Sequence, residues 1–320
     1  MSNTFGDKWS FTSFGESHGA AIGGVLDGVP AGLHIDFAQI REALERRAGK
    51  ADSQSLPEGK GVSPRALREP DEVEWLSGVM EGVTLGTPIA FIIRNKDARP
   101  EDYEYLKHSY RIGHADKVYE QKYGIRDYRG GGRASARETA ARVVAGEIAK
   151  QELAAKGIVI HAQLIQVGAE TDPAKFTDTI ASYQREGDSI GGIIECRING
   201  LPVGTGEPIF DKLQAHLAYA VMSINACKGF EYGTGFERVT QPGSAINHLS
   251  GGIAGGISDG SEIIFRCVFK PTPTTKKALD ELLNSQMVNG QVVHRSDPCV
   301  AVRAVPIVEA MAALALVQFL

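Results

Sequence analysis

The sequence predicts an α+β fold built as a layered sandwich. Its strand-like segments pair mainly as hairpins, which favours antiparallel sheets over the alternating units of a parallel sheet. Its helical segments are grouped centrally instead of following each strand in turn. Each half contains a glycine-rich loop, a long helix and then strands, which hints at an internal pseudo-duplication without a residue-level repeat. We therefore expect no Rossmann sheet.

The first half of the chain is predicted to contain strands, one capped helix and a long loop. Asp36 is a suitable N-cap for the helical spacing of residues 35–47. Residues 48–68 are rich in Gly, Ser, Pro and Lys, and a loop of this length is typical of a functional or disordered segment. The other segments are two strands around a loop within 11–32, strands at 71–81 and 87–95, and a loop leading into a short helix at 110–124.

The second half begins with the clearest helix, which we expect from Ser135 to Gly157. Its apolar positions share one broad face, and the glycine is a stop signal. A second loop and helix are expected at 204–229, with Pro208 near the first turn and Gly229 as the end. The remaining segments are strands at 159–169, 191–202 and 262–271, a polar helix between the first two, and a C-terminal helix at 306–320.

Composition excludes several classes of function. The net charge of −5 gives no global attraction for nucleic acid or an anionic membrane surface, so an anion site must be local. The four cysteines form no CxxC pair, which predicts buried free thiols in a reducing cytoplasm. The longest apolar run, residues 310–317, is too short to span a bilayer, and the N-terminus has no signal-peptide pattern. We expect a cytoplasmic protein of one large domain or two packed ones.

Residues 126–139, RDYRGGGRASARET, form the most unusual loop. Residues 126–142 contain five arginines and only two acidic residues, Asp127 and Glu138, which gives a local charge of +3. Glycines allow close backbone approach, and a helix starting near Ser135 would direct its free N–H groups at the loop. Neither G-x-G-x-x-G nor a P-loop is present, so the loop lacks the two best-known nucleotide-binding motifs. One interpretation of its arginines is that their guanidinium groups bind phosphate. A solvated, ion-paired helix face is the alternative.

Three further segments carry candidate chemistry. His18 in GESHG and His114 in RIGHAD lie in glycine-flanked loops beside charged residues, which suits proton transfer near neutral pH; surface histidines are the alternative. KPTPTTK at 270–276 is a rigid, hydroxyl-rich turn, and HRSDPC places Asp297 before a proline; ordinary turns are the alternative. No motif with metal-ligand spacing is present, so we expect no metal.

In combination, these blocks resemble the chorismate synthase family. The resemblance rests on FGESHG, RIGHADKVYEQKYG, RDYRGGGRASARETAARVVAGEIAK, GEPIFDKL, MSINACKGFEYGTGF, GGIAGGISDG, KPTPT and DPCVAVRAVPIVEAM, in order along the chain. It implies a β-α-β sandwich of central helices between antiparallel sheets, a single catalytic domain over 1–320 and a homotetramer. It also implies a lyase that converts 5-enolpyruvylshikimate-3-phosphate to chorismate with reduced FMN and no net redox change, in aromatic amino acid biosynthesis.

The resemblance also implies roles for individual residues. His18 would be the acid at the leaving phosphate, His114 would protonate the reduced flavin, and Asp297 would assist a proton relay at the flavin. Arg46, Arg47 and Arg137 would serve the substrate or NADP region. The FMN contacts implied are Arg133, Ala134, Ser135, Asn225, Ala226, Gly255, Lys270, Pro271, Thr272, Pro273, Thr274 and Arg295.

This chain departs from the family pattern in places. RRAGK replaces an RPG-type stretch, leaving Lys50 as the nearby base, and Ser296 stands where the family often has histidine. The segment between Gly243 and Gly251 and the one after Thr274 are shorter than usual. The alternative function is an FMN- or phosphate-binding protein without turnover. A kinase or phosphosugar transferase is disfavoured, because the chain has no P-loop. Without a dinucleotide fingerprint, we expect NADPH to act only through an external flavin reductase.

Overall fold

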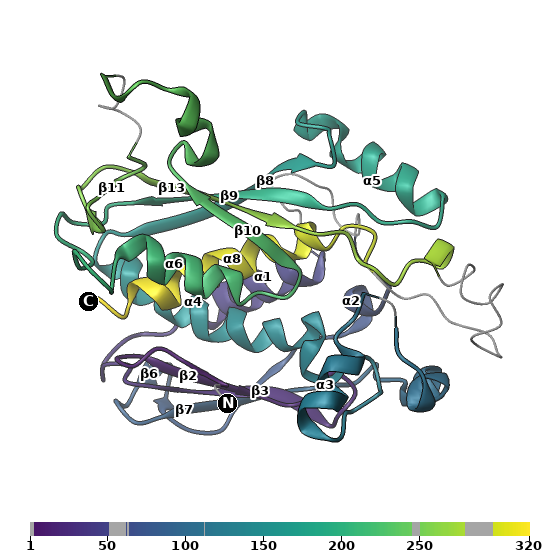
Figure 1. The fold of residues 1–320 in the computed structure, drawn as a ribbon. Helices are drawn as coiled ribbons and strands as arrows, with labels where there is room; N and C mark the ends of the chain where they lie inside the picture. Colours follow the sequence, from purple (N-terminus) through teal and green to yellow (C-terminus); the bar gives the residue numbers. More distant parts are fainter. Residues whose placement is uncertain (1–2, 51–61, 63, 112, 245–249, 279–296) are drawn as a thin grey trace.

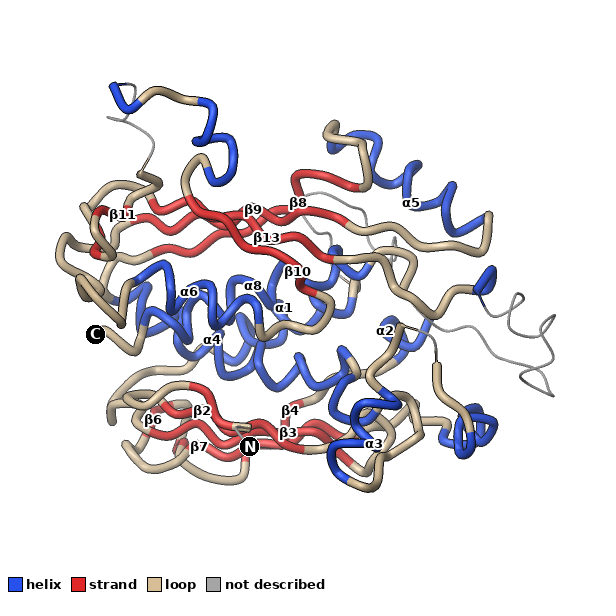
Figure 2. The backbone as a smooth tube through the Cα atoms, viewed as in Figure 1, coloured by secondary structure: helices blue, strands red, loops and turns tan. Residues whose placement is uncertain are grey.

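Two antiparallel sheets enclose a layer of helices (Figure 1). The computed structural model describes residues 3–50, 62, 64–111, 113–244, 250–278 and 297–320. Figure 2 shows the helices in blue between the two sheets in red. The predicted α+β sandwich is therefore confirmed. Residues before the central helix α4 build one sheet, and residues after it build the other.

The first sheet comes from the N-terminal third of the chain. Its strand order is β1-β2-β3-β7-β4, and every neighbouring pair is antiparallel. Along β7, Ile89, Phe91 and Ile93 are fully buried on one face, which is the alternation expected of a strand covered on one side. The strands are β1 Thr4–Phe5, β2 Ser10–Phe14, β3 Ala21–Asp27, β4 Val73–Trp75 and β7 Ile89–Arg94, with a small hairpin of β5 Val79–Met80 and β6 Val83–Thr84.

The second sheet has the order β10-β13-β9-β8, again antiparallel throughout. Ile194, Cys196 and Ile198 of β9 are buried toward the helices. The short 3₁₀ turn η4 Pro173–Lys175 leads into α5 Phe176–Arg185, which lies on the outer side of this sheet (Figure 1). The strands are β8 Val159–Val167, β9 Gly192–Asn199, β10 Cys227–Tyr232 and β13 Ile263–Phe269, with a hairpin of β11 Ile253–Ala254 and β12 Ile257–Ser258.

The middle layer consists of α1 Phe37–Ala48, α4 Thr139–Ala155, α6 Leu213–Met222 and α8 Val300–Leu316. Helix α8 is buried on all faces, as expected for a helix covered by both sheets and its neighbours. Asp36 caps α1 by accepting from the backbone N–H groups of Ala38 and Gln39, as predicted. The helices α4 and α8 share one hydrophobic core with both sheets.

The contact between α4 and α8 depends on Gly146. A Cβ added at this residue would overlap with the Cα and Cβ of Ala310 on α8. We expect Gly146→Ala to lower the free energy of unfolding by about 1–3 kcal/mol, because the two helices must separate to admit the methyl group. Urea unfolding measures this, and the double variant Gly146→Ala, Ala310→Gly should recover only part of the loss, because the added Cβ still meets the Cα and the carbonyl oxygen of residue 310. An unchanged urea midpoint in the single variant would contradict the close packing.

Shorter helices lie at one end of the sandwich, beside the region where α4 begins (Figure 1). They are α2 Pro64–Arg68, α3 Asp116–Tyr123 and the 3₁₀ helix η1 Pro100–His108. Helix α2 falls within the segment 48–68 that we predicted as a loop, so that prediction is wrong for its last residues. Residues 51–61 and 63 of the same segment lie outside the described residues.

Two predicted helix ends are corrected. Ser135 caps only a 3₁₀ turn, η3 Ala136–Glu138, which follows η2 Gly132–Ala134, and α4 starts at Thr139. The helix expected at 204–229 ends at Met222, and the residues near Gly229 form β10 because they pair with β13.

Proline misled the prediction at two helix starts. Helix α6 begins five residues after Pro208, at Leu213. Helix α8 begins at Val300 and contains Pro306, which we had taken as its first residue. Burial on all sides stabilises α8 enough to tolerate a missing backbone donor.

Two further predictions meet the structure directly. The four cysteines are free and buried, as predicted. Among the described residues, no helix is long and apolar enough to cross a membrane.

Candidate active site

A cavity of about 410 Å³ opens at the end of the sandwich where α2, η1 and the glycine-rich loop meet the helix layer. Both histidines singled out in the sequence line it. Its volume is within the range of small-molecule sites. Its described walls come from α2, from Arg111 and residues 113–115, from the segments 130–137, 225–228 and 270–274, and from the region of 297–303 at the start of α8.

The three glycines of the RGGGRAS loop run between the two histidines. Gly130, Gly131 and Gly132 all have positive φ, which an L side chain rarely adopts. A Cβ on Gly130 would overlap with the ring of His18, and one on Gly131 would lie 2.8 Å from Cε1 of His114. The glycines therefore let the backbone pass close to both imidazoles. This is the function of the glycine run: it positions the loop against the two rings.

His18 is held in place by its neighbour and by α2. Its Nδ1 lies 2.9 Å from the hydroxyl of Ser17, and that hydroxyl donates to the backbone carbonyl of Gly130. Its Nε2 lies 3.3 Å from a guanidinium nitrogen of Arg65. The imidazole is buried and packs edge-on against the ring of Tyr103.

His114 is oriented by a carboxylate. Its Nδ1 lies 2.9 Å from Asp116 and 3.0 Å from a guanidinium nitrogen of Arg111, and that guanidinium nitrogen donates to the carboxylate at 2.6 Å. Because the carboxylate can only accept, Nδ1 carries the proton. Arg111 binds the same carboxylate through two nitrogens, at 2.8 and 2.6 Å. Burial would raise the pKa of Asp116, but the hydrogen bonds from Arg111 and His114 outweigh it and hold that pKa well below its usual range. The Nε2 atom is then the nitrogen of His114 that remains for a ligand.

A buried ion-pair network forms the inner wall. Arg47 and Arg137 both bind Asp71, and Arg47 does so at 3.1 Å with only 1% of its side chain exposed. Arg303 donates to the carbonyl of Arg47 and pairs with Asp297 at 2.9 Å. Burial first, and then the charge of Arg303, lower the pKa of Arg47 to about 9, so it stays charged at neutral pH. One carboxylate thus serves two buried guanidinium groups.

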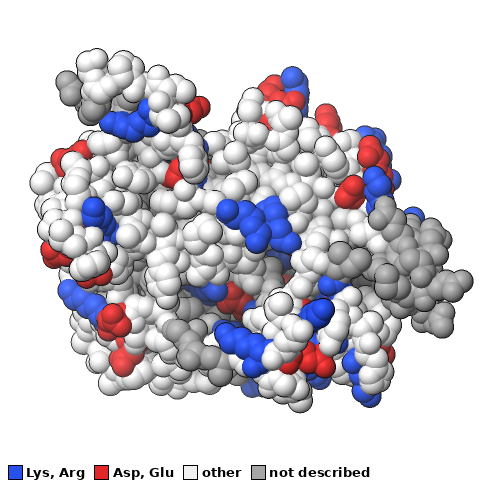
Figure 3. All heavy atoms as spheres, viewed as in Figure 1, with Lys and Arg blue, Asp and Glu red and all other residues white. Residues whose placement is uncertain are grey.

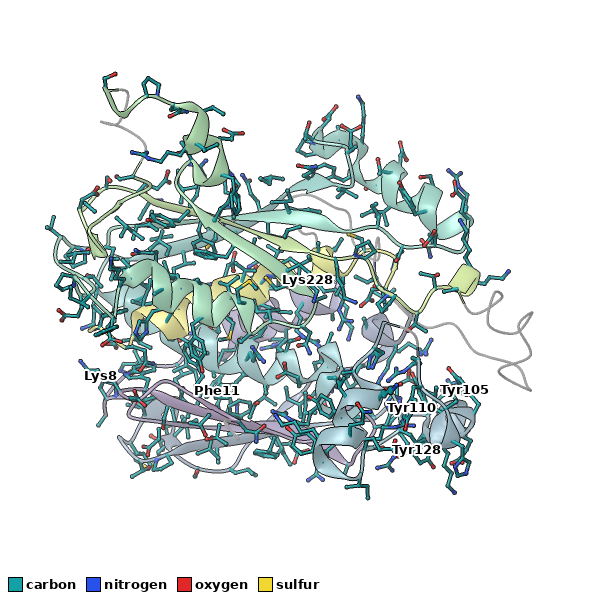
Figure 4. All side chains as sticks on the ribbon, in the orientation of Figure 1. Lys8, Phe11, Tyr105, Tyr110, Tyr128 and Lys228 are labelled. Carbon is teal, nitrogen blue, oxygen red and sulfur yellow. The ribbon has the colours of Figure 1, made fainter. Side chains whose placement is uncertain are left out.

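The outer wall adds more positive charge. Lys228 and Lys270 line the cavity, and neither has an ion pair to a carboxylate among the described residues. Burial and the charge of Lys228 lower the pKa of Lys270. Lys228, which is labelled in Figure 4, lies at the start of β10, and Figure 3 shows Lys and Arg side chains gathered near the centre of the face turned to the viewer.

Counting the described lining residues, seven cationic side chains surround three carboxylates. Such an excess is destabilising in a partly buried cavity unless an anion offsets it, and guanidinium groups favour phosphate and carboxylate. The cavity is therefore suited to an anionic ligand. The cations are Arg47, Arg65, Arg111, Arg137, Lys228, Lys270 and Arg303, and the carboxylates are Glu69, Asp71 and Asp297.

Most of the residues predicted as functional meet in this cavity. The structure brings together the three candidate catalytic residues and most of the candidate ligand contacts. Those lining it are His18, His114, Asp297, Arg47, Arg137, Ala134, Ser135, Asn225, Ala226 and the turn of Lys270, Pro271, Thr272, Pro273 and Thr274. Their individual roles stay predictions.

Three predicted residues do not line it, and a fourth cannot be placed because it lies outside the described residues. Arg46 forms a salt bridge with Glu309 at 3.0 Å inside the helix layer. Arg133 donates to Ser13 and lines a second cavity, of about 660 Å³, on the other side of the glycine loop. Gly255 lies in the turn between β11 and β12. Arg295 is outside the described residues.

The arginine cluster of residues 126–142 is corrected in part. Arg126 pairs with Glu120, Arg129 with Asp127, and Arg142 with Glu138. These three do not line the cavity, so they are the ion-paired side chains of our alternative reading. Of the five arginines in this cluster, only Arg137 lines the cavity, as the anion-binding prediction requires.

Sequence reasoning missed Arg65, Arg303 and Lys228 as cavity residues. Arg65 comes from α2, in a segment we predicted as a loop. Arg303 lies six residues after Asp297, in the first turn of α8, and this helix was predicted to begin later. Lys228 stands in the quoted MSINACKG block, so its position beside Asn225 and Ala226 was the available signal.

The fold and the cavity together define an α+β sandwich protein with a cationic cavity that two histidines line. The sequence model of the family described as chorismate synthase matches residues 9–320. The chain is 46% identical to the chorismate synthase of Christiangramia forsetii, over 99% of this chain and 97% of that protein, and 46% identical to that of Porphyromonas gingivalis, over 98% and 94%. The chain belongs to the chorismate synthase family.

A solved structure agrees with this assignment. A crystal structure of a chorismate synthase superimposes with a TM-score of 0.74 at 28% identity, covering 98% of this chain and 92% of that one. The match spans both sheets and the helix layer because it covers nearly the whole chain.

Proposed function

We propose that this cavity converts 5-enolpyruvylshikimate-3-phosphate to chorismate, with reduced FMN bound beside the substrate. The observation that carries the proposal is the excess of cationic side chains around two oriented histidines. Both ligands are anionic, and the departing group is phosphate. A binding protein without turnover would need the charges but not two positioned proton-transfer groups.

The residues present suit a flavin. The side-chain oxygen of Asn225 is buried and has no hydrogen-bond donor among the described residues, so it can accept from a ligand N–H or hydroxyl. Ala226 has φ of +67°, a strained conformation for a non-glycine residue that is often found at ligand sites. We propose that these two, the Lys270 turn and Lys228 hold FMN. When bound in reduced form, FMN supplies electron density to the substrate and recovers it.

The chain's own residues move protons and hold charge in this proposal. As the carbon–oxygen bond breaks, its electron pair leaves with phosphate, and His18 supplies a proton to the departing oxygen. The ring hydrogen leaves as a proton, and the pair that bound it enters the ring's double bonds. His114 is held by Asp116 to keep a proton beside the flavin, and Asp297, held by Arg303, assists removal of the ring proton.

The two lysines of the outer wall give a direct binding test. We expect Lys228→Gln or Lys270→Gln to weaken FMN binding about 10- to 100-fold, because each change removes one charge-assisted contact. Fluorescence titration of FMN measures the loss. Lys8→Gln is the control, since Lys8 is exposed and lies far from Lys228 in Figure 4. Equal affinities for all variants would show that FMN does not bind at this wall.

Anaerobic turnover tests the function itself. Folded protein with chemically reduced FMN and the enolpyruvyl phosphate substrate should form chorismate. NADPH with oxidised FMN should support turnover only after an external flavin reductase is added, and we propose that the working assembly is a homotetramer. FMN binding without chorismate would favour the alternative of a binding protein.

A further inference from the structure

Arg65 is the feature that the proposed roles leave unexplained. It reaches from α2 across the cavity to the loop that carries His18, with 16% of its side chain exposed. One terminal nitrogen donates to the carbonyl of Ser17 at 2.8 Å, and the other lies 3.3 Å from Nε2 of His18. Its Nε pairs with Glu69 at 3.3 Å. Each of its nitrogens therefore has a separate partner.

These contacts assign the proton of His18. A guanidinium group can only donate, so Nε2 of His18 must accept from Arg65. The ring proton is then on Nδ1, which donates to the hydroxyl of Ser17, and that hydroxyl donates onward to Gly130. All three bonds are satisfied only by the neutral ring with its proton on Nδ1. In this arrangement His18 has no proton to give from Nε2.

Arg65 is the cation in contact with Nε2 of His18, and two further described groups face the ring. From η1 the neutral ring of Tyr103 packs against it, and from the loop before the glycines Asp127 faces it. Asp127 is already bound by Arg129 through two nitrogens, at 2.7 and 2.9 Å. Arg65 is in contact with Nε2, and a cation there opposes a second positive charge on the ring.

Arg65 is paired with one carboxylate, Glu69, and lies near a second guanidinium group, that of Arg137. Burial lowers its pKa, Glu69 raises it, and the nearby charge of Arg137 lowers it further. A phosphate group in the cavity would be a stronger acceptor for the NH1 group of Arg65 than the neutral imidazole nitrogen that NH1 contacts. The same phosphate would attract a proton to His18.

We infer that Arg65 couples phosphate binding to protonation of His18. Without an anion, Arg65 donates to Nε2 and keeps His18 neutral. When phosphate binds, the NH1 group of Arg65 donates a hydrogen bond to a phosphate oxygen instead. The Nε2 atom of His18 then takes up one proton from solvent, and the protonated ring donates a hydrogen bond to the phosphate. The inference rests on the proposed function in taking phosphate as the anion. It makes His18 an acid only when a phosphate group is present to receive the proton.

Nitrogen-15 NMR spectra of the histidine rings test this inference. They are recorded on the full chain, with inorganic phosphate as the probe, and the signal of His18 is assigned by its absence in His18→Ala. Near neutral pH, the phosphate-free protein should show His18 neutral with its proton on Nδ1. Saturating phosphate should protonate both nitrogens, with uptake of about one proton per phosphate in calorimetry across buffers. In Arg65→Met, His18 should already be partly protonated without phosphate, and the proton uptake should fall by at least about half.

Two further variants separate the contact from folding and from general charge. Lys228→Met should weaken phosphate binding but leave the phosphate-free spectrum of His18 unchanged. Arg65→Lys keeps a charge on α2 and should restore part of the neutral state. Protonated Nε2 in the phosphate-free protein, no change at His18 on saturation, or a wild-type spectrum in folded Arg65→Met would overturn the inference. Failure to form chorismate changes none of these spectra, so failure of the proposed function is a separate result.

Discussion

His18→Ala and His114→Ala are each expected to lower turnover by about 10²- to 10⁴-fold, the range of positioned proton-transfer groups, and in any case at least tenfold. The two rings lie on opposite sides of the glycine run, so neither can replace the other. FMN affinity should stay nearly unchanged, because the proposed flavin contacts are Asn225, Ala226 and the lysine-bearing walls. Anaerobic kinetics with reduced FMN, together with FMN titration, measure both quantities.

His108→Ala is the matched control for this pair. His108 is exposed at the end of η1, six residues before His114, and does not line the cavity. Its turnover should equal that of the unmodified chain. Unaltered turnover in His18→Ala or in His114→Ala would remove that histidine from the mechanism.

The largest effect on stability is expected from Asp71→Asn. The substitution keeps the shape of the side chain and suits the positive φ of 50° at this residue, but it leaves Arg47 and Arg137 without their shared carboxylate. Removing one partner of a buried ion pair costs about 3–5 kcal/mol, so unfolding in urea should begin at clearly lower concentrations. Glu74→Gln is the control, since it breaks an exposed salt bridge with Arg94 and should leave the urea midpoint nearly unchanged.

The same carboxylate predicts a pH dependence. Burial raises the pKa of Asp71, but Arg47 and Arg137 lower it more, so the folded-state pKa lies below that of the unfolded chain. The stabilising contribution is then present above the unfolded-state pKa, roughly 3.9, and is lost as pH falls through the folded value. The stability gap between Asp71→Asn and the unmodified chain should be constant near neutral pH and shrink below about pH 4. A gap that widened in acid would contradict the ion-pair assignment.

The layer architecture could be predicted because its signals are local. Alternating residues such as Ile89, Phe91 and Ile93 mark strands covered on one side, and Asp36 marks a helix start. Proline signals failed at α8 because burial on all sides outweighs the missing donor of Pro306. Local sequence signals therefore predicted the segments that are exposed on one face, and they failed where tertiary packing decides the structure.

The site could be predicted only in part. The blocks around His18, His114 and Asp297 gave the residues that meet in the cavity. The sequence could not show which arginines of one loop face the cavity. Arg137 faces it and Arg133 faces the opposite side, because their partners, Asp71 and Ser13, come from distant segments. The contact between Arg65 and His18 also required the structure, because it joins α2 to a loop 47 residues away.

The most direct test of the central claim is the stoichiometry of one anaerobic reaction. Protein, reduced FMN and 5-enolpyruvylshikimate-3-phosphate are mixed, and chorismate, phosphate and the flavin spectrum are followed together. If the cavity carries out the elimination, chorismate and phosphate appear at equal rates, and FMN ends as reduced as it began. Phosphate released without chorismate, or no product from folded protein that binds FMN, would contradict it.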